Sequence, residues 1–243
     1  MSHFRALRIH EQNGLYTAAV ESLALDSLPP GEVLIAVEYS SLNYKDALSA
    51  AGNKGVTRQY PHTPGIDAAG VVLASEVTAC PVGSRVIVTG FDLGMNTAGG
   101  FGQRIRVPAA WCVSLPEGWS TRTAMCYGTA GLTAALCVDK LLRHGATPEQ
   151  GPVLVTGASG AVGLVAVSLL ARLGFDVQAV SGKAAQHEIL KQLGARTVYG
   201  REVVAAQSKP MLKPIWAHAV DTVGGDVLVE VIKQLRPGGA VAA

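Results

Sequence analysis

The chain has 243 residues, of which 49% are hydrophobic and 16% are charged. This length suits one large domain or two ordinary ones, and no apolar run approaches the roughly 18 residues that a membrane-spanning helix needs. The net charge is +2, from 20 Lys and Arg against 18 Asp and Glu, and no basic run is dense. We therefore expect neither a nucleic acid nor a membrane as a partner.

The first half of the chain predicts short strands separated by turns that are rich in Pro and Gly. The segment 32–39 (EVLIAVEY) has the period of a strand, with Val33, Ile35, Val37 and Tyr39 on one face, and three further strand patterns cover 68–75, 84–90 and 101–109. Short, closely spaced strands of this kind are typical of a compact and mostly antiparallel β-domain.

After Pro116 the pattern changes. A helical period over 121–145 precedes an alternation of strands and helices that predicts a parallel, doubly wound sheet. The predicted strands are 152–156, 176–180, 195–200, 217–224 and 239–243, and the predicted helices between them are 161–174, 184–194 and 226–236. We place the domain boundary between residues 118 and 119.

Four cysteines lie at scattered spacings without a C-x-x-C pair: Cys80, Cys112, Cys126 and Cys137. This usage predicts reduced thiols that are mostly packed, as is usual for cytoplasmic proteins. The first residues, MSHFRALRIHEQNG, lack the apolar stretch of a signal peptide. We expect a cytoplasmic protein.

A glycine-rich turn joins the first predicted parallel strand to its helix, with the sequence GASGAVG at 157–163. Gly160 lets the backbone approach a pyrophosphate, Gly163 lets the helix pack against the strand, and the helix N-terminus offers unpaired N–H groups. The first Gly of the usual G-x-G-x-x-G pattern is Ala158 here. Together with its strand and helix, the turn predicts a dinucleotide site.

The end of the next strand indicates which dinucleotide binds. NAD enzymes place an Asp or Glu there to bind the ribose 2′-hydroxyl, whereas this chain has Ser181, Gly182 and Lys183. A hydroxyl and an ammonium attract a 2′-phosphate that a carboxylate would repel, and Arg201 adds a second cation. The predicted cofactor is NADPH.

The fingerprint also fits the TG-x-x-G-x-x-G pattern of extended short-chain dehydrogenases. That family begins with the fingerprint and needs a Tyr-x-x-x-Lys motif, whereas about 150 residues come first here and no tyrosine has a lysine four positions later. The alternative therefore fails.

The order of a β-domain followed by a nucleotide domain resembles the medium-chain dehydrogenase/reductase superfamily. Zinc members carry Cys-x-x-Asp and Gly-His-Glu, and the matching stretches here are 43–46 (NYKD) and 65–67 (GID). Asn43 and Ile66 replace two ligands, and a single thiol cannot hold zinc. We predict no metal, and we interpret Cys126 as a packed core residue.

The stretches SSLNYKDALSAAG, PGIDAAGVV, GTAGLTAALCV, VTGASGAVG, VSGK, LGA and DTVGGDVL resemble the acrylyl-CoA reductase type of the zinc-free quinone oxidoreductase branch. The resemblance implies a GroES-like catalytic β-domain over 1–118 and a Rossmann NADPH-binding domain over 119–243 whose C-terminal part is missing. It also implies a homodimer for the full-length protein.

The resemblance implies that the chain reduces a short 2-enoyl-CoA with NADPH, such as acryloyl-CoA to propanoyl-CoA. It places Tyr44 beside the nicotinamide ribose as the candidate catalytic residue, and it makes Thr129 and Thr133 candidates for the nicotinamide region. The residues that it places around the cofactor are Tyr44, Ser159, Gly160, Ala161, Val162, Ser181, Gly182, Lys183 and Arg201. Two alternatives stay open: an NADPH:quinone reductase of the same branch, and a non-catalytic NADPH-binding protein.

Overall fold

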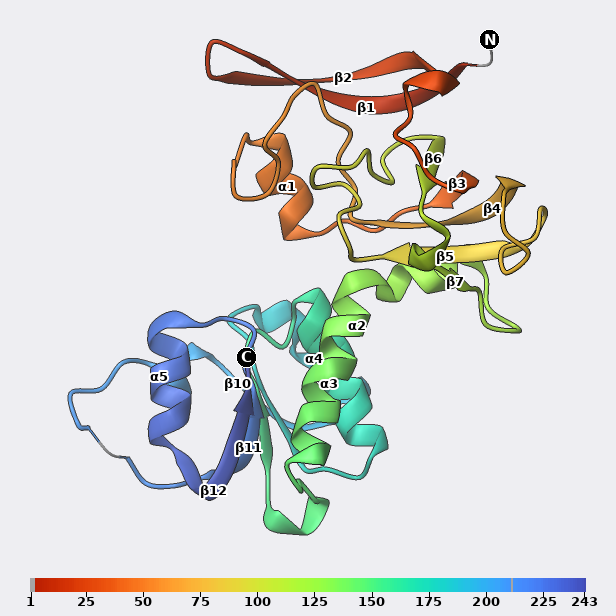
Figure 1. Cartoon of the computed structure of the whole chain (residues 1–243). Helices are drawn as coiled ribbons and strands as arrows, with labels where there is room; N and C mark the ends of the chain where they lie inside the picture. Colours follow the sequence, from red (N-terminus) through yellow and green to blue (C-terminus); the bar gives the residue numbers. More distant parts are fainter. Residues whose placement is uncertain (1–2, 211) are drawn as a thin grey trace. The chain divides into compact units, whose positions relative to one another are not determined.

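The computed structural model describes residues 3–210 and 212–243. The chain divides between Thr129 and Ala130 into two compact units, the first built mainly from strands and the second from a sheet with helices (Figure 1). The domain boundary predicted between residues 118 and 119 stays a prediction, because the division into compact units does not have to coincide with the boundary between functional domains.

A two-stranded antiparallel hairpin begins the first unit. It joins β1 (His3–Gln12) to β2 (Leu15–Ala24) through the two residues Asn13 and Gly14, which have φ of 53° and 78°. Two positive φ values suit a type I′ turn, for which Asn-Gly is the preferred sequence. The dipeptide Asn-Gly was therefore a usable signal for this hairpin, which the strand patterns of the sequence missed.

A five-stranded antiparallel sheet forms the rest of the β-structure in this unit. Its strand order is β6-β3-β4-β5-β7, and every pairing within it is antiparallel. The strands are β3 (Val33–Tyr39), β4 (Asp67–Ser75), β5 (Arg85–Thr89), β6 (Arg104–Val107) and β7 (Cys112–Ser114). Val33, Ile35, Val72 and Val88 lie in its apolar core. The predicted antiparallel β-domain is confirmed.

A short helix, α1 (Tyr44–Ala50), follows the first strand of this sheet. Asp46, the third residue of the helix, stabilises its first turn, because the Asp46 Oδ2 accepts a hydrogen bond of 2.8 Å from the backbone N–H of the N-cap residue Asn43. Its Oδ1 accepts two more, from the N–H groups of Gly65 and Ile66 at 3.1 and 3.0 Å. Asp46 therefore ties the start of the helix to the segment that leads into β4.

Helix α2 (Thr121–Arg143) covers the predicted helical stretch, but it is broken at Gly128, where φ is 47° and ψ is −148°. The break has a packing reason. A Cβ atom at position 128 would lie 2.6 Å from both the Asp67 Oδ2 and the Ser41 Oγ, so only glycine permits this approach and this backbone conformation.

The second unit contains a five-stranded sheet of order β10-β9-β8-β11-β12, and all its pairings are parallel. The strands are β8 (Val153–Val155), β9 (Val177–Val180), β10 (Ala195–Tyr199), β11 (Trp216–Val220) and β12 (Leu235–Ala242), and the helices are α3 (Ala161–Arg172), α4 (His187–Gln192) and α5 (Gly225–Lys233). The strand and helix alternation of the sequence is confirmed as a parallel sheet.

The two faces of this parallel sheet have separate cores. Val153 and Val155 pack in a cluster with Ala166 and Leu170 of α3, while Leu154 packs in a second cluster that contains Val231 of α5. Successive residues of a strand point to opposite faces, which accounts for the division. Helices α3 and α5 therefore cover opposite faces, as a doubly wound sheet requires.

Candidate cofactor and active site

The glycine-rich turn after β8 is tightly packed. A Cβ atom at Gly163 would lie 2.5 Å from the Gly157 carbonyl oxygen and 2.6 Å from the Ala158 Cα. Gly157 itself has φ of 56°, and a Cβ there would lie 2.3 Å from the Thr222 Oγ1. Gly163 is therefore needed for the close contact between helix and strand. Gly157 is needed both for its close contact with Thr222 and for its backbone conformation.

Ala158, which departs from the usual glycine pattern, is fully buried. Its N–H donates 3.1 Å to the Val180 carbonyl, so the turn is bonded to the end of β9 and its methyl group fills core space. Gly160, by contrast, has φ of −82°, a value that any residue adopts. Glycine at 160 is therefore not needed for backbone conformation, and it leaves the backbone open to a ligand.

The N-terminus of α3 carries no capping side chain. Gly160 is the N-cap residue and makes no side-chain hydrogen bond to the helix. The first N–H groups of a helix have no partner within it, and they favour an anion together with the helix dipole. Ser159, Ala161 and Val162 surround this end. The arrangement suits a pyrophosphate.

A cavity of about 410 Å³ lies beside the ends of β9 and β10. Its lining residues are Ser181, Gly182, Ala184, His187, Gly200, Arg201 and Glu202. The cavity thus brings together Ser181, Gly182 and Arg201, three of the residues predicted to surround a 2′-phosphate. The buried Ser181 hydroxyl donates 2.8 Å to the Ser159 Oγ and accepts 3.1 Å from the Lys183 N–H, which links this cavity to the glycine-rich turn.

The cations of this region are open to a ligand. None of the ion pairs among the described residues involves Lys183 or Arg201. The sequence analysis did not predict the other lining residues, and two of them have titratable side chains. The His187 Nε2 lies 3.0 Å from the Ser181 carbonyl, and the Glu202 Oε1 accepts 3.1 Å from the Gly200 N–H. Glu202 directly follows Arg201, whereas nothing in the sequence links His187 to this cavity.

Tyr44, the candidate catalytic residue, is the first residue of α1 and its side chain is largely exposed, at 80%. It belongs to the first compact unit, and the other predicted cofactor residues belong to the second. Its neighbour Asn43 takes part in a buried polar network.

The two stretches that match the zinc-binding segments are joined by carboxylates. Besides the bonds that Asp46 makes, the Asn43 Nδ2 donates 2.9 Å to the Asp67 Oδ2 and 3.2 Å to the Ser41 Oγ. Burial raises the pKa of Asp46, and its three backbone N–H donors oppose that shift. Hydrogen bonds thus connect the positions that hold metal ligands in zinc relatives.

Asp67 is the centre of that network. The Thr129 N–H donates 2.9 Å to its Oδ2, and the Thr129 Oγ1 donates 2.7 Å to its Oδ1. Thr129, which the family resemblance makes a candidate for the nicotinamide region, thus begins the second part of α2 with its backbone N–H bound to a buried carboxylate.

Within the described residues, no group of three or more His, Cys, Asp or Glu side chains has an arrangement that could hold a metal ion. Cys126, which the sequence analysis interpreted as a packed core residue, is exposed, so that interpretation was wrong. Its neighbours Ala124 and Met125 are the buried residues of this turn, and the helical rotation of about 100° per residue carries Cys126 to the outside.

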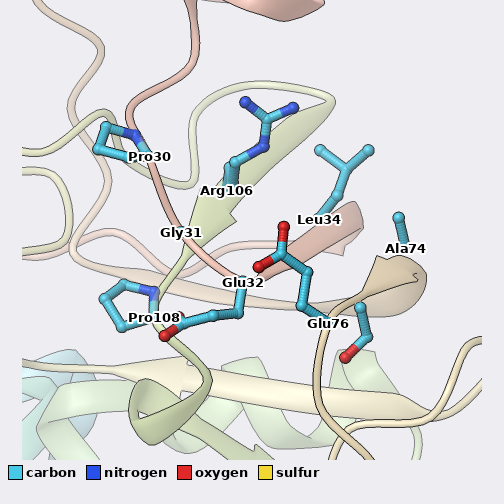
Figure 2. Close-up of a pocket in the computed structure, with 9 residues that line it drawn as sticks. Pro30, Gly31, Glu32, Leu34, Ala74, Glu76, Arg106 and Pro108 are labelled. Atoms are coloured by element: carbon cyan, nitrogen blue, oxygen red, sulfur yellow. The ribbon is translucent and has the colours of Figure 1, made fainter.

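Another cavity, of about 740 Å³, lies elsewhere in the first unit. Figure 2 shows it between the ends of β3, β4 and β6, with Glu32, Glu76 and Arg106 around it. It contains none of the predicted site residues, so we do not assign the cofactor to it.

No helix in the described part of the chain has the length and apolar character needed to cross a membrane.

Comparison with known proteins connects this geometry to a family. Residues 29–117 match the alcohol dehydrogenase GroES-like domain. An acrylyl-CoA reductase of Ruegeria pomeroyi is 47% identical over 96% of this chain and 71% of its own length.

Two solved structures are similar over nearly the whole chain. An oxidoreductase of Salmonella enterica in complex with NADP superposes with a TM-score of 0.93 at 47% identity, over 98% of this chain and 73% of its own. A Bacillus subtilis protein with NAD bound superposes with a TM-score of 0.94 at 42% identity, over 99% of this chain and 74% of its own. The chain therefore belongs to the medium-chain dehydrogenase/reductase superfamily, in the acrylyl-CoA reductase type of its zinc-free quinone oxidoreductase branch.

Proposed function

We propose that this protein reduces a short 2-enoyl-CoA with NADPH, with acryloyl-CoA as substrate and propanoyl-CoA as product. The observation that carries the proposal is the 47% identity to an acrylyl-CoA reductase over 96% of the chain. The cavity beside Arg201 supports the choice of cofactor, because it combines a buried hydroxyl with a guanidinium that takes part in none of the ion pairs of the described residues.

The reaction needs a hydride, which NADPH supplies when it is bound. The thioester carbonyl withdraws electrons from the alkene, so that the hydride and its two electrons add to Cβ while negative charge develops on the carbonyl oxygen. A proton from solvent then adds to Cα. The work of the protein is to orient the reactants and to stabilise the developing charge.

The residues of this chain divide that work between binding and orientation. We assign the pyrophosphate to the N-terminus of α3 with Ser159, Gly160, Ala161 and Val162. We assign the 2′-phosphate to the side chains of Ser181, Lys183 and Arg201, with Gly182 leaving room for the guanidinium. Tyr44 holds the nicotinamide ribose, and its role in the reaction is to fix the position of the ring.

A direct assay tests the activity. Purified protein is mixed with NADPH and acryloyl-CoA, and the absorbance of the reduced nicotinamide is followed as the thioester is varied. We expect consumption of NADPH that depends on acryloyl-CoA. Turnover of a quinone without turnover of any enoyl-CoA would favour a quinone reductase, the activity after which this branch is named. Tight NADPH binding without turnover of either would indicate a non-catalytic binding protein.

The cofactor requires its own test, because one similar structure contains NADP and another contains NAD. Lys183→Glu replaces a cation beside the cavity by an anion. We expect the affinity for NADPH to fall about tenfold or more, and the affinity for NADH to change by less than about twofold. Equal losses for both cofactors would contradict the assignment of the 2′-phosphate.

We further infer a cytoplasmic location, since all four cysteines are free thiols and disulfides are rare in reducing compartments. A homodimer remains our proposal for the assembly of the full-length protein, and light scattering of the purified full-length protein tests it.

A further inference from the structure

Glu202 is an acidic side chain in the cavity where we place the 2′-phosphate, and the proposed function gives it no role. It lines this cavity of about 410 Å³ together with Ser181, Gly182 and Arg201. The sequence has no acid at the end of β9, but the structure supplies one from just beyond β10. Because β9 and β10 pair in parallel, their carboxyl ends lie at the same edge of the sheet.

The Glu202 carboxylate is held at the cavity by the turn that follows β10. Its Oε1 accepts a hydrogen bond of 3.1 Å from the Gly200 N–H. A Cβ atom at position 200 would clash with the Glu202 Oε2, so glycine leaves room for the carboxylate to lie there. Within residues 3–210 and 212–243, no recorded hydrogen bond uses this second oxygen, which can therefore accept one from a ligand.

Arg201 and Glu202 bring opposite charges to one cavity without neutralising each other. None of the ion pairs in the described part of the chain includes either residue. The Arg201 side chain lies over Gly182 at the end of β9, whereas the Glu202 carboxylate lies over Gly200. A sphere with the volume of the cavity is about 9 Å across, so both charges act on a group that the cavity holds.

We propose that Glu202 is a specificity-determining residue that lowers the preference for NADPH over NADH. The inference rests on the proposed function, because it takes the 2′ group of the cofactor to lie in this cavity. The 2′-phosphate of NADPH is an anion, which the Glu202 carboxylate repels and Arg201 attracts. The ribose of NADH has a hydroxyl at this position, and a hydroxyl donates a hydrogen bond to a carboxylate. The two neighbouring side chains thus favour different cofactors.

The measurement that tests this role is the ratio of two dissociation constants, that of NADH divided by that of NADPH, obtained by calorimetry without substrate. Glu202→Gln removes the charge and keeps an oxygen that accepts from the Gly200 N–H. We expect tighter binding of NADPH and a rise of the ratio by about fivefold or more, the size expected for a phosphate with nearly two negative charges across such a cavity in water. A residue that only stabilises the turn would leave the ratio unchanged.

Glu188→Gln is the matched control, because it makes the same chemical change at an exposed residue of α4 that does not line the cavity. We expect its ratio to stay within about twofold of the wild-type value. High salt should reduce the gain of Glu202→Gln, since salt screens exposed charges. If this variant does not fold, as judged by circular dichroism, Glu202→Ala provides a second neutral replacement. A ratio that does not rise in the folded neutral variant, or a gain that salt does not reduce, overturns the proposal.

Failure of the proposed function gives a different result. If the wild-type protein binds neither NADPH nor NADH, the assignment of the cofactor is wrong and the role of Glu202 falls with it. If the wild-type protein binds both cofactors and reduces no enoyl-CoA, the proposed reaction is wrong. The ratio still tests Glu202 in that case, because the measurement contains no substrate.

Discussion

The Arg201 guanidinium lies directly against the backbone of Gly182. A Cβ atom at position 182 would be 2.5 Å from the Arg201 Nε and 3.0 Å from its Cζ. Glycine therefore allows the cation to reach the cavity where we place the 2′-phosphate.

Gly182→Ala tests this relationship. The clash falls on a flexible side chain and Gly182 has an unstrained φ, so we expect the free energy of unfolding to change by less than about 0.5 kcal/mol. The displaced Arg201 should lower the affinity for NADPH about tenfold, and the affinity for NADH should stay nearly constant. Calorimetry with both cofactors measures the difference.

Arg201→Ala and the double variant serve as the control. If Gly182 acts through Arg201, the two changes remove the same interaction, and the double variant should bind NADPH no more weakly than Arg201→Ala alone. Fully additive losses would mean that Gly182 affects the cofactor by another route.

Much of this cavity could be predicted from the sequence because the strand ends and their missing acid are local patterns. Ser181, Gly182 and Lys183 are consecutive, and Arg201 follows the next strand. His187 could not be predicted in the same way, since its contact with the Ser181 carbonyl depends on how α4 begins. The hydrogen bonds of Asp67 could not be predicted from the sequence either, because its partners Ser41 and Thr129 are brought together only by the fold.

The glycines of the phosphate-binding turn should separate stability from binding. Gly163→Ala places a methyl group against backbone atoms at 2.5 and 2.6 Å, which cannot move aside as a side chain can. We expect it to lower the free energy of unfolding by about 1–3 kcal/mol, as overpacking does. Urea unfolding measures this change.

Gly160→Ala is the matched variant. Its Cβ would meet only the Gly157 carbonyl oxygen, at 3.2 Å, so we expect a loss of stability below about 1 kcal/mol. The same methyl group would cover the backbone at the proposed pyrophosphate site, and NADPH affinity should fall about tenfold or more. A variant that binds NADPH as the wild type does would contradict the proposed position of the pyrophosphate.

His218 should make the second unit sensitive to acid. Its Nε2 lies 2.7 Å from the Gln150 Oε1, and its Nδ1 accepts 3.2 Å from the Ala240 N–H. The second bond requires an unprotonated Nδ1, so the ring is neutral. Burial lowers the pKa of His218, and the nearby His144 makes a smaller contribution in the same direction. The unfolded chain therefore binds more protons, and stability should fall as the pH drops below about 6.5.

The variant His218→Asn isolates this contribution. Its amide oxygen still accepts from Ala240 but does not titrate, so we expect a loss of about 2 kcal/mol at pH 8 and a weaker dependence on pH between 7.5 and 5.5. Burial also lowers the pKa of His62, and that part of the acid sensitivity should persist in the variant. Identical pH slopes for the two proteins would show that His218 does not contribute.

The helix α2 explains why the packing of one cysteine was predicted wrongly. The sequence shows a single helical period over 121–145, whereas the helix is interrupted at Gly128. An interruption changes the rotational phase, so apolar residues before and after it do not share one continuous face. Cys126 lies just before the break and is exposed.

The four thiols should therefore react at different rates. Burial, with a smaller contribution from Cys80, raises the pKa of Cys112 to about 12, and burial also raises the pKa of Cys137. Cys80 is itself buried. Because the thiolate is the reactive form, we expect Cys126 to react first when the native protein is mixed with a disulfide reagent such as dithionitrobenzoate at neutral pH.

Cys126→Ser identifies the reactive thiol. The fast phase, equivalent to one thiol, should disappear in this variant, and the remaining thiols should react only slowly until the protein is denatured with guanidinium. A fast phase that survives the substitution would show that Cys112 or Cys137 is more accessible than its burial indicates. Since the thiolate fraction rises with pH, the Cys112 reaction should stay slow up to about pH 9, well below its raised pKa.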